Sequence, residues 1–341
     1  MHFDVIIGNP PYQKNDGGGK GTSAIPLYNE FVKIAKKFNP SFITMIIPAR
    51  WFTGGRGLKT FREDMLNDMR IVEIHDFPDS NDCFPDVVIK GGVCYFLWVK
   101  DYRGECKVVT RRKNKIISKK KRPLRINGLD LFIRRNECVP IVEKVRCFKE
   151  PTFDKLISAN DPFGLDTRLE NSHRRNVIKT YKTPFSGCVL LYYHGWKRNG
   201  PLYINKNIIR RNLNFVNRKK ILIPKAWGGG NSDTDKLKPF IVEPNSCNTE
   251  TYLIILGNFS DNQLNNIILY TETKFFHHLV LVMKTTQNAM RKVYSLIPIQ
   301  DFSEVWDDNR LYEKYNLTNQ EISFIEKNTL RAVETGLFSR T

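Results

Sequence analysis

The stretch Phe3-Asp4-Val5-Ile6-Ile7-Gly8-Asn9-Pro10-Pro11-Tyr12 (FDVIIGNPPY, residues 3–12) decides the fold. Residues 3–7 form a short, continuous, β-branched run that a glycine closes, and this pattern predicts a buried strand of a parallel sheet. Open α/β sheets bind their ligands at the carboxyl ends of such strands. The tetrapeptide Asn-Pro-Pro-Tyr over residues 9–12 is therefore expected at a ligand-binding edge.

The segments that follow alternate between helical and strand patterns. Apolar residues recur at helical spacing over 25–38, and an Asn-Pro pair ends that predicted helix. A buried strand is predicted over 42–50 and a second helix over 57–69. Two more strands are predicted over 71–77 and 87–99, the last bent at a Gly-Gly pair. This order describes half of an open α/β sheet with right-handed crossovers.

Composition favours a globular protein with a polyanionic partner. The chain has 341 residues, 41% of them apolar, and a formal net charge of +19. Such a charge indicates a nucleic-acid partner. We find no apolar run that approaches the ~20 residues of a membrane span and no signal-peptide pattern. Seven cysteines occur singly, which predicts a reducing, cytoplasmic location without a metal-binding cysteine motif.

The pattern changes after about residue 104. Residues 107–125 hold ten Lys and Arg and no acid, which is typical of a solvated linker or an edge hairpin. Beyond residue 151 short strands (within 186–195, 219–227 and 251–257) and glycine-rich turns predict a mixed α+β or mostly β domain. A last helix is predicted over 318–334, with Thr318 and Glu321 in a capping-box pattern.

The predicted second domain carries an interval suited to DNA. No acidic residue occurs between Glu170 and Asp233, and thirteen Lys and Arg fall there. Cations neutralise phosphates, and Asn and Arg side chains read base edges. The predicted DNA contacts, as a group, are Lys197, Arg198, Arg210, Arg211, Lys219 and Lys220.

Residues 9–12 suit the methylation of an exocyclic amine. Two prolines remove backbone donors and leave carbonyls free to accept hydrogen bonds. The Asn9 amide oxygen and the Pro10 carbonyl would each accept one N–H bond, which would aim the amine lone pair at a methyl donor. Tyr12 would stack on a base that has left the duplex.

On these residues the sequence resembles the S-adenosylmethionine-dependent N6-adenine DNA methyltransferases of type II restriction–modification systems, gamma class. FDVIIGNPPYQ is similar to their catalytic motif, and PLYNEFVKIAKKF and FITMIIPARWF to the segments after it. CFPDVVIKGGVCYFLW fits the element that stacks on the second face of the adenine, with Phe84 as the matching residue. Residues 285–326 are similar to the tail of such enzymes.

The resemblance implies a partial Rossmann-like methyltransferase sheet, its C-terminal half, followed by a DNA target-recognition domain. The implied division is a catalytic half-domain over 1–104, a basic linker or edge segment over 105–150, the recognition domain over 151–300 and a helical tail over 301–341. Transfer of methyl from S-adenosylmethionine to N6 of a flipped adenine in double-stranded DNA is implied. Asn9, Pro10, Pro11 and Tyr12 would form the catalytic segment, and Tyr12 and Phe84 would stack on the base.

One departure from the family concerns the methyl donor. Its main site, a glycine-rich loop after the first strand and an acid after the second, precedes Asn-Pro-Pro-Tyr in the family and is not found here. The chain is therefore expected to be a portion of a longer or split methyltransferase, inactive alone. Its partners would be an N-terminal methyltransferase half or a cognate endonuclease. A non-catalytic DNA-recognition subunit, and a methyltransferase acting on RNA or protein, remain alternatives.

Overall fold

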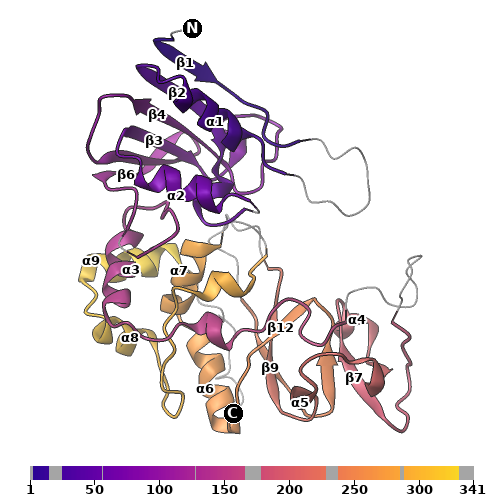
Figure 1. Cartoon of the computed structure of the whole chain (residues 1–341). Helices are drawn as coiled ribbons and strands as arrows, with labels where there is room; N and C mark the ends of the chain where they lie inside the picture. Colours follow the sequence, from indigo (N-terminus) through magenta and orange to yellow (C-terminus); the bar gives the residue numbers. More distant parts are fainter. Residues whose placement is uncertain are drawn as a thin grey trace. The chain divides into compact units, whose positions relative to one another are not determined.

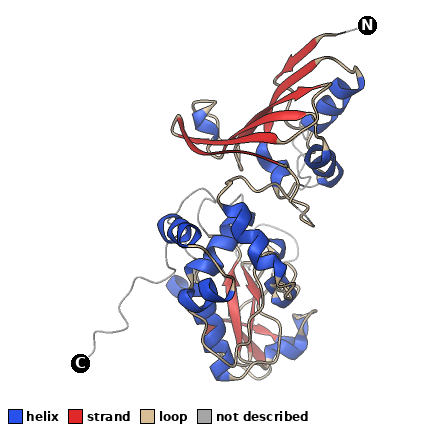
Figure 2. Cartoon of the chain, turned by 90° about the vertical axis from the view of Figure 1, so that its left-hand side faces the viewer, coloured by secondary structure: helices blue, strands red, loops and turns tan. Residues whose placement is uncertain are grey.

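The computed structural model describes residues 3–14, 25–55, 57–126, 128–165, 178–227, 237–284 and 288–329. The chain divides into two compact units, Met1–Glu143 and Lys144–Thr341. Figure 1 shows the chain from indigo to yellow, and Figure 2 shows helices and strands in both units. The fold is of the mixed α/β class. None of the described helices is long and apolar enough to cross a membrane.

A six-stranded mixed sheet forms the frame of the first unit, in the order β1-β2-β4-β3-β5-β6. Its strands are β1 (Val5–Gly8), β2 (Phe42–Pro48), β3 (Ile71–Phe77), β4 (Val93–Val99), β5 (Cys106–Arg112) and β6 (Lys115–Arg122). β1 runs parallel to β2 and β3 to β5, whereas β4 lies antiparallel between β2 and β3. The strand predicted over 71–77 is confirmed residue for residue.

Helices α1 (Tyr28–Lys37) and α2 (Lys59–Asn67) supply the helical part of the first core. α1 buries Tyr28, Val32 and Ala35, which recur on one side of the helix, against strand residues such as Ile43. The core continues through the 3-10 turn Ala49–Phe52 to Phe132. This packing fixes the carboxyl ends of β1 and β2 at one end of the sheet.

The structure differs from one prediction for residues 87–99 and decides another for residues 107–125. The strand predicted over 87–99 begins only at Val93, because Gly91 and Gly92 adopt φ values of 92° and 77° and turn the chain. A Cβ at Gly92 would lie 2.1 Å from the Phe77 carbonyl oxygen, so only glycine fits there. The basic run over 107–125 takes the edge-hairpin form, as β5 and β6.

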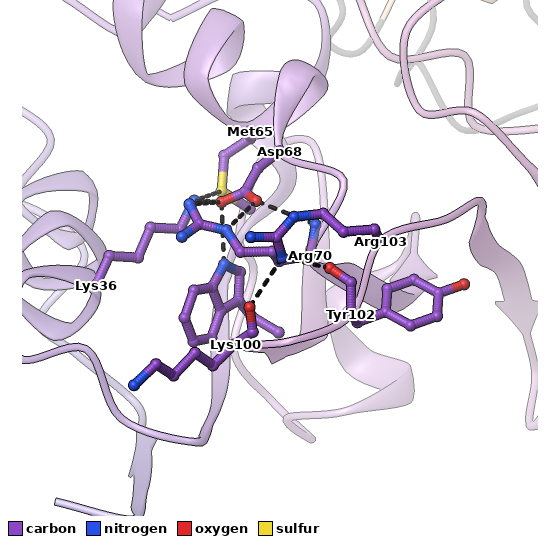
Figure 3. A network of polar contacts seen from close by, with 8 residues as sticks. Lys36, Met65, Asp68, Arg70, Lys100, Tyr102 and Arg103 are labelled. Carbon is purple, nitrogen blue, oxygen red and sulfur yellow. Dashed lines mark hydrogen bonds and ion pairs between the residues drawn. The ribbon is translucent and has the colours of Figure 1, made fainter.

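A buried carboxylate ties α1 and α2 to the sheet at the opposite end of β2 (Figure 3). Asp68 accepts hydrogen bonds from Lys36 Nζ at 2.7 Å and Arg70 Nε at 2.7 Å. It also accepts from Trp98 Nε1 at 3.0 Å. Burial opposes ionisation, but the bonds from Arg70 and Lys36 hold the pKa of Asp68 well below its usual value. The ion pair therefore fixes the orientation of α1 on the sheet.

The second unit contains two three-stranded sheets and a group of helices. One sheet has the order β11-β7-β8 and the other β10-β9-β12. The strands are β7 (Cys188–Tyr192), β8 (Leu202–Asn205), β9 (Lys220–Pro224), β10 (Phe240–Val242), β11 (Ser246–Asn248) and β12 (Tyr252–Ile254). The strands predicted within 186–195, 219–227 and 251–257 are thus present.

The helices of the second unit are α4 (Trp196–Asn199), α5 (Leu213–Val216), α6 (Asp261–Glu272), α7 (Lys274–Met283), α8 (Asp308–Lys314) and α9 (Asn319–Asn328). α3 (Cys138–Cys147) contains the boundary between the units. Short 3-10 turns occupy Ser80–Asp82, Phe153–Leu156, Lys206–Ile208 and Arg291–Tyr294. The predicted capping box of α9 is confirmed at Thr318 and Glu321, and residues 330–334 of that predicted helix lie outside the described residues.

Candidate active site

A cavity of about 730 Å³ opens at the carboxyl end of β1. The segment that follows β1 forms one wall, and the residues around Phe84 form another. The lining residues are Asn9, Pro10, Pro11, Tyr12, Gln13, Pro26, Tyr28, Pro48, Arg50, Leu58, Phe84, Val87, Val88, Ile89 and Lys90. The structure thus brings together, in one pocket, all five residues that the sequence placed in the catalytic and stacking roles.

Backbone hydrogen bonds hold the Asn-Pro-Pro-Tyr segment to the start of α1. The Tyr12 carbonyl accepts from the Leu27 N–H at 3.1 Å, and the Lys14 N–H donates to the Ile25 carbonyl at 3.0 Å. Pro10 is buried, whereas the Asn9 side chain is exposed. Among the described residues, no hydrogen-bond partner is seen for the Asn9 amide. The segment is therefore fixed at its far end while its first polar group faces the pocket.

The second wall, which Phe84 and residues 87–90 form, is held by a serine and an ion pair. Ser80 Oγ donates to the Val87 carbonyl at 2.6 Å and accepts from the Ile89 N–H at 2.9 Å. The Arg134 guanidinium hydrogen-bonds the Gly91 carbonyl and lies 3.3 Å from an Asp76 carboxylate oxygen. Burial raises the pKa of Asp76 to about 6, against the opposing effect of Arg134. These contacts fix the backbone at Val87, Ile89 and Gly91.

The described residues that line the pocket include two neutral phenols and two cationic side chains. Burial, with smaller contributions from Cys94 and Cys83, raises the pKa of Tyr12 to about 12. Burial also raises the pKa of Tyr28. The described lining residues include no Asp, Glu or His, and their charges come from Arg50 and Lys90. Such a site can accept and donate hydrogen bonds and stack on a planar ligand, and its described lining residues offer no carboxyl or imidazole group.

Sequence reasoning missed several of the lining residues. Arg50 lies two residues after the end of β2, so the rule that ligands bind at the carboxyl ends of strands could have found it. Lys90 was hidden because residues 87–92 were read as strand. Tyr28 was not singled out from the sequence; its hydroxyl is buried without a hydrogen-bond partner in the described structure.

A methyl-donor site of the kind expected in the family would place a glycine-rich loop between a strand and a helix. Within the described ranges, no strand leads directly into a glycine-rich loop that opens a helix.

The predicted DNA contacts lie in the second unit. Lys197 and Arg198 are exposed on α4, and Arg210 and Arg211 are exposed before α5. Lys197 Nζ lies 5.7 Å from the ring centroid of Trp196 and 5.8 Å from that of Phe240. The rings of Trp196 and Phe240 are stacked with centroids 5.8 Å apart. An aromatic and cationic surface of this kind can contact bases and phosphates.

The structure corrects the prediction for Lys220. Its side chain is 1% exposed, and its ammonium donates to Ser246 Oγ at 2.9 Å and the Arg218 carbonyl at 3.0 Å. Burial lowers the pKa of Lys220 to about 8. The neighbouring Lys219 pairs with Asp261 at 2.7 Å. Lys220 thus satisfies internal acceptors instead of facing a ligand.

Comparison with known proteins finds matches for part of the chain. Residues 1–84, which include Asn9 and Phe84, match the family described as Eco57I restriction-modification methylase. An uncharacterized adenine-specific methylase of Mycoplasma pneumoniae is 42% identical over 117 residues, which are 34% of this chain and 28% of that protein. These matches confirm the predicted resemblance to adenine-specific methyltransferases of restriction–modification systems. The chain spans less than a third of that relative.

Two solved structures resemble the chain more weakly. The type IIL restriction-modification enzyme MmeI, in complex with DNA, has a TM-score of 0.49 at 10% identity, over 85% of this chain and 45% of that one. The type IIG restriction endonuclease BpuSI has a TM-score of 0.36 at 12% identity, over 95% of this chain and 53% of that one. At these scores the likeness does not establish a shared fold.

Proposed function

We propose that this chain provides the target-amine side of a DNA adenine-N6 methyltransferase of a restriction–modification system. The observation that carries the proposal is the pocket that unites Asn9, Pro10 and Tyr12 with Phe84 at the carboxyl end of a parallel strand. The match of residues 1–84 to a methylase family supports it.

In the proposed reaction the adenine leaves the duplex and enters the pocket. The Asn9 side-chain oxygen and the Pro10 carbonyl accept the two N–H bonds of the exocyclic amine. This draws the nitrogen toward tetrahedral geometry and fixes the direction of its lone pair. Tyr12 and Phe84 stack on the base from the two walls, and Arg50 and Lys90 suit the phosphates of the extruded nucleotide.

Side-chain proton transfer has no part in this proposal. The described lining residues of the pocket include no carboxylate or imidazole, and the raised pKa of Tyr12 keeps its phenol neutral. Preorganised acceptors and orientation would supply the rate enhancement. S-adenosylmethionine, when bound, supplies an electrophilic methyl group. Its main binding site would lie outside the described residues, on another half that completes the partial Rossmann-like sheet of this chain.

The second unit would act as the target-recognition domain. The exposed cations of α4 and of the segment before α5 would bind the phosphates of double-stranded DNA, with Lys197, Arg198, Arg210 and Arg211 as the proposed contacts. Trp196 and Phe240 lie beside Lys197 and offer apolar contact area. A cognate restriction endonuclease would cut DNA that lacks the methyl mark.

Two measurements on the full chain test the proposal. Equilibrium dialysis with S-adenosylmethionine shows whether the chain binds the donor alone. Duplex DNA, RNA and protein are each incubated with the chain and the donor, with and without a complementary donor-binding polypeptide. Mass spectrometry of nucleosides from the nucleic acids, and of peptides from the protein, then shows where the methyl group goes. We expect N6-methyladenine in duplex DNA, and its loss by a factor of at least ~100 in Asn9→Ala.

The control is Asn81→Ala, which removes an exposed amide that does not line the pocket. It should leave methylation unchanged. Methyl transfer that survives in Asn9→Ala, or that appears in RNA or protein instead of DNA, would contradict the proposal. The second candidate function is a DNA-recognition subunit, because the described residues include no glycine-rich donor loop. Binding of duplex DNA without methylation under every condition would favour it.

A further inference from the structure

We propose that the hairpin of β5 and β6, residues 106–122, is an additional DNA-binding surface that holds backbone phosphates beside the pocket. We call it the basic hairpin. Its charges and geometry indicate a polyanionic partner, and the choice of double-stranded DNA as that partner rests on the proposed function. The DNA contacts proposed above belong to the second unit, whereas the basic hairpin belongs to the first.

The basic hairpin concentrates positive charge that the protein does not neutralise. It carries nine Lys and Arg and no acid. Some of these cations have internal partners: Lys107 pairs with Glu73 at 2.8 Å, and Arg122 Nε donates to Asn136 Oδ1 at 2.7 Å. Five exposed lysines have no acidic partner among the described residues, namely Lys113, Lys115, Lys119, Lys120 and Lys121. Such a surface attracts phosphates.

Like charges also face one another across the two strands. In the register of the hairpin Arg112 lies opposite Lys115, and Lys107 lies opposite Lys121. Directly opposite like charges destabilise an antiparallel pair. Lysines on the outer strand alone would protect the sheet edge from further pairing, so edge protection does not account for cations on both strands. A bound polyanion would relieve this repulsion.

The turn of the basic hairpin places a lysine where other residues are preferred. Lys113 and Asn114 form the two-residue loop between β5 and β6, with φ values of 49° and 59°. Loops with two positive φ values favour Asn and Gly, because other side chains are strained in the left-handed region. Asn114 follows this preference and Lys113 departs from it. Strain of this kind gathers at functional positions, and here it keeps a cation at the exposed tip.

Two hydrogen bonds attach the basic hairpin to the second wall of the pocket. The Lys113 N–H donates to Asp82 Oδ2 at 2.8 Å, and Asp82 ends a 3-10 turn two residues before Phe84. Along β5, Thr110 Oγ1 donates at 2.8 Å to the carbonyl of Arg134, whose guanidinium holds the far end of the same wall. Phosphates bound at the tip would therefore lie next to the pocket that receives the extruded base.

The spacing of the exposed lysines suits a phosphate backbone. Val108 packs in the core with residues of α1 and α2, so its neighbour Val109 and the cross-strand partner Lys119 lie on the other face. Lys121 shares that face, about 6.5 Å along β6. Each DNA strand advances about 3.4 Å per phosphate, so about two phosphates span this length. Contacts of this kind orient a duplex without reading its sequence.

The test uses the full chain and a fluorescent DNA duplex of about 30 base pairs and mixed sequence, because phosphate contacts are independent of sequence. Fluorescence anisotropy at several salt concentrations gives the slope of log K against log salt. The double variant Lys119→Gln with Lys121→Gln should reduce the magnitude of that slope by about 2, and should weaken binding by at least about tenfold at about 0.15 M salt. The same duplex made of RNA is measured in parallel.

The matched control is the double variant Lys33→Gln with Lys37→Gln, which removes the same charge from α1. It should change the slope by less than about 0.5. A second pair of variants separates charge from folding. Lys113→Gly relieves the strain of the turn and removes a cation, so the melting temperature should hold or rise while the slope falls by about 1. Asn114→Gly relieves similar strain, keeps the charge and should leave the slope unchanged.

Equal slopes for the two double variants, or a full slope in Lys113→Gly, would overturn the inference. A loss confined to duplex RNA would overturn it as well. Reduced slopes in the hairpin variants, with no methylation of DNA under any condition, would leave the inference standing and refute the proposed function. Methylation of DNA by the completed enzyme, with slopes that the hairpin variants do not change, would do the reverse.

Discussion

Gly92 offers a quantitative test of how the second wall of the pocket is held. It has φ of +77°, and a Cβ there would lie 2.1 Å from the Phe77 oxygen and 2.7 Å from the Pro78 oxygen. Both are backbone atoms, so neither can rotate away. An alanine in the left-handed region costs about 1–2 kcal/mol, and overpacking adds about 1–3 kcal/mol. We therefore expect Gly92→Ala to lower the free energy of unfolding by about 3 kcal/mol.

Gly57 supplies the matched control. It has the same φ of +77°, lies in the same unit, and would place a Cβ with nothing within 4 Å. Gly57→Ala should therefore cost about 1 kcal/mol, the conformational part alone. Urea unfolding followed by circular dichroism measures both values, and the slope of each transition checks that the unfolded states are comparable. Equal losses in the two variants would refute the claim that a backbone clash makes glycine necessary at residue 92.

Further predictions concern acid stability, DNA binding and the pH profile. Asp68 has a folded pKa below its usual 3.8, so its stabilisation is present above about pH 4 and is lost as pH falls through the folded value; Asp68→Asn should lower stability at pH 7 by about 2 kcal/mol and flatten the acid limb of a stability curve. If stability falls with acid in Asp68→Asn as it does in the unchanged protein, the ion pair of Asp68 does not cause the acid sensitivity. Replacing Lys197 and Arg198 together by alanine should reduce the slope of log K against log salt by about 2, as measured by fluorescence anisotropy with duplex DNA, and an unchanged slope would remove α4 from the interface. Single-turnover methylation by the completed enzyme should vary little between pH 6 and 9, since the pKa of Tyr12 is about 12; a step near pH 7 would reveal a catalytic acid or base.

Sequence patterns predicted the first unit better than the second. Strand Ile71–Phe77 was found because its short, β-branched run follows the predicted second helix, where an alternating α/β pattern calls for a strand. The pocket residues Asn9 and Tyr12 were found because they directly follow such a run. Helix α7 was not predicted because its sequence, KFFHHLVLVM, is buried on nearly every side and has no polar stripe to mark the helical period.

The remaining errors came from tertiary context. Lys220 reads as an exposed cation in an acid-free interval, but it begins β9 with its side chain directed inward to Ser246. Residues 87–90 line the pocket and include three β-branched residues typical of a strand, but Gly91 and Gly92 after them turn the chain before β4 begins. In both cases the local sequence is typical of the structure that was predicted. Packing against residues distant in the sequence gives the segment a different structure.

The separation of the two cores has an evolutionary consequence. One core runs from Tyr28 to Phe132 and the other from Phe163 to Ile254, and every residue that lines the pocket lies in the first unit. Mutations that accumulate after residue 144 therefore leave Asn9 and Phe84 in place. Under the proposed function, a lineage could acquire a new target sequence by drift or recombination in the second unit while inheriting its chemistry unchanged.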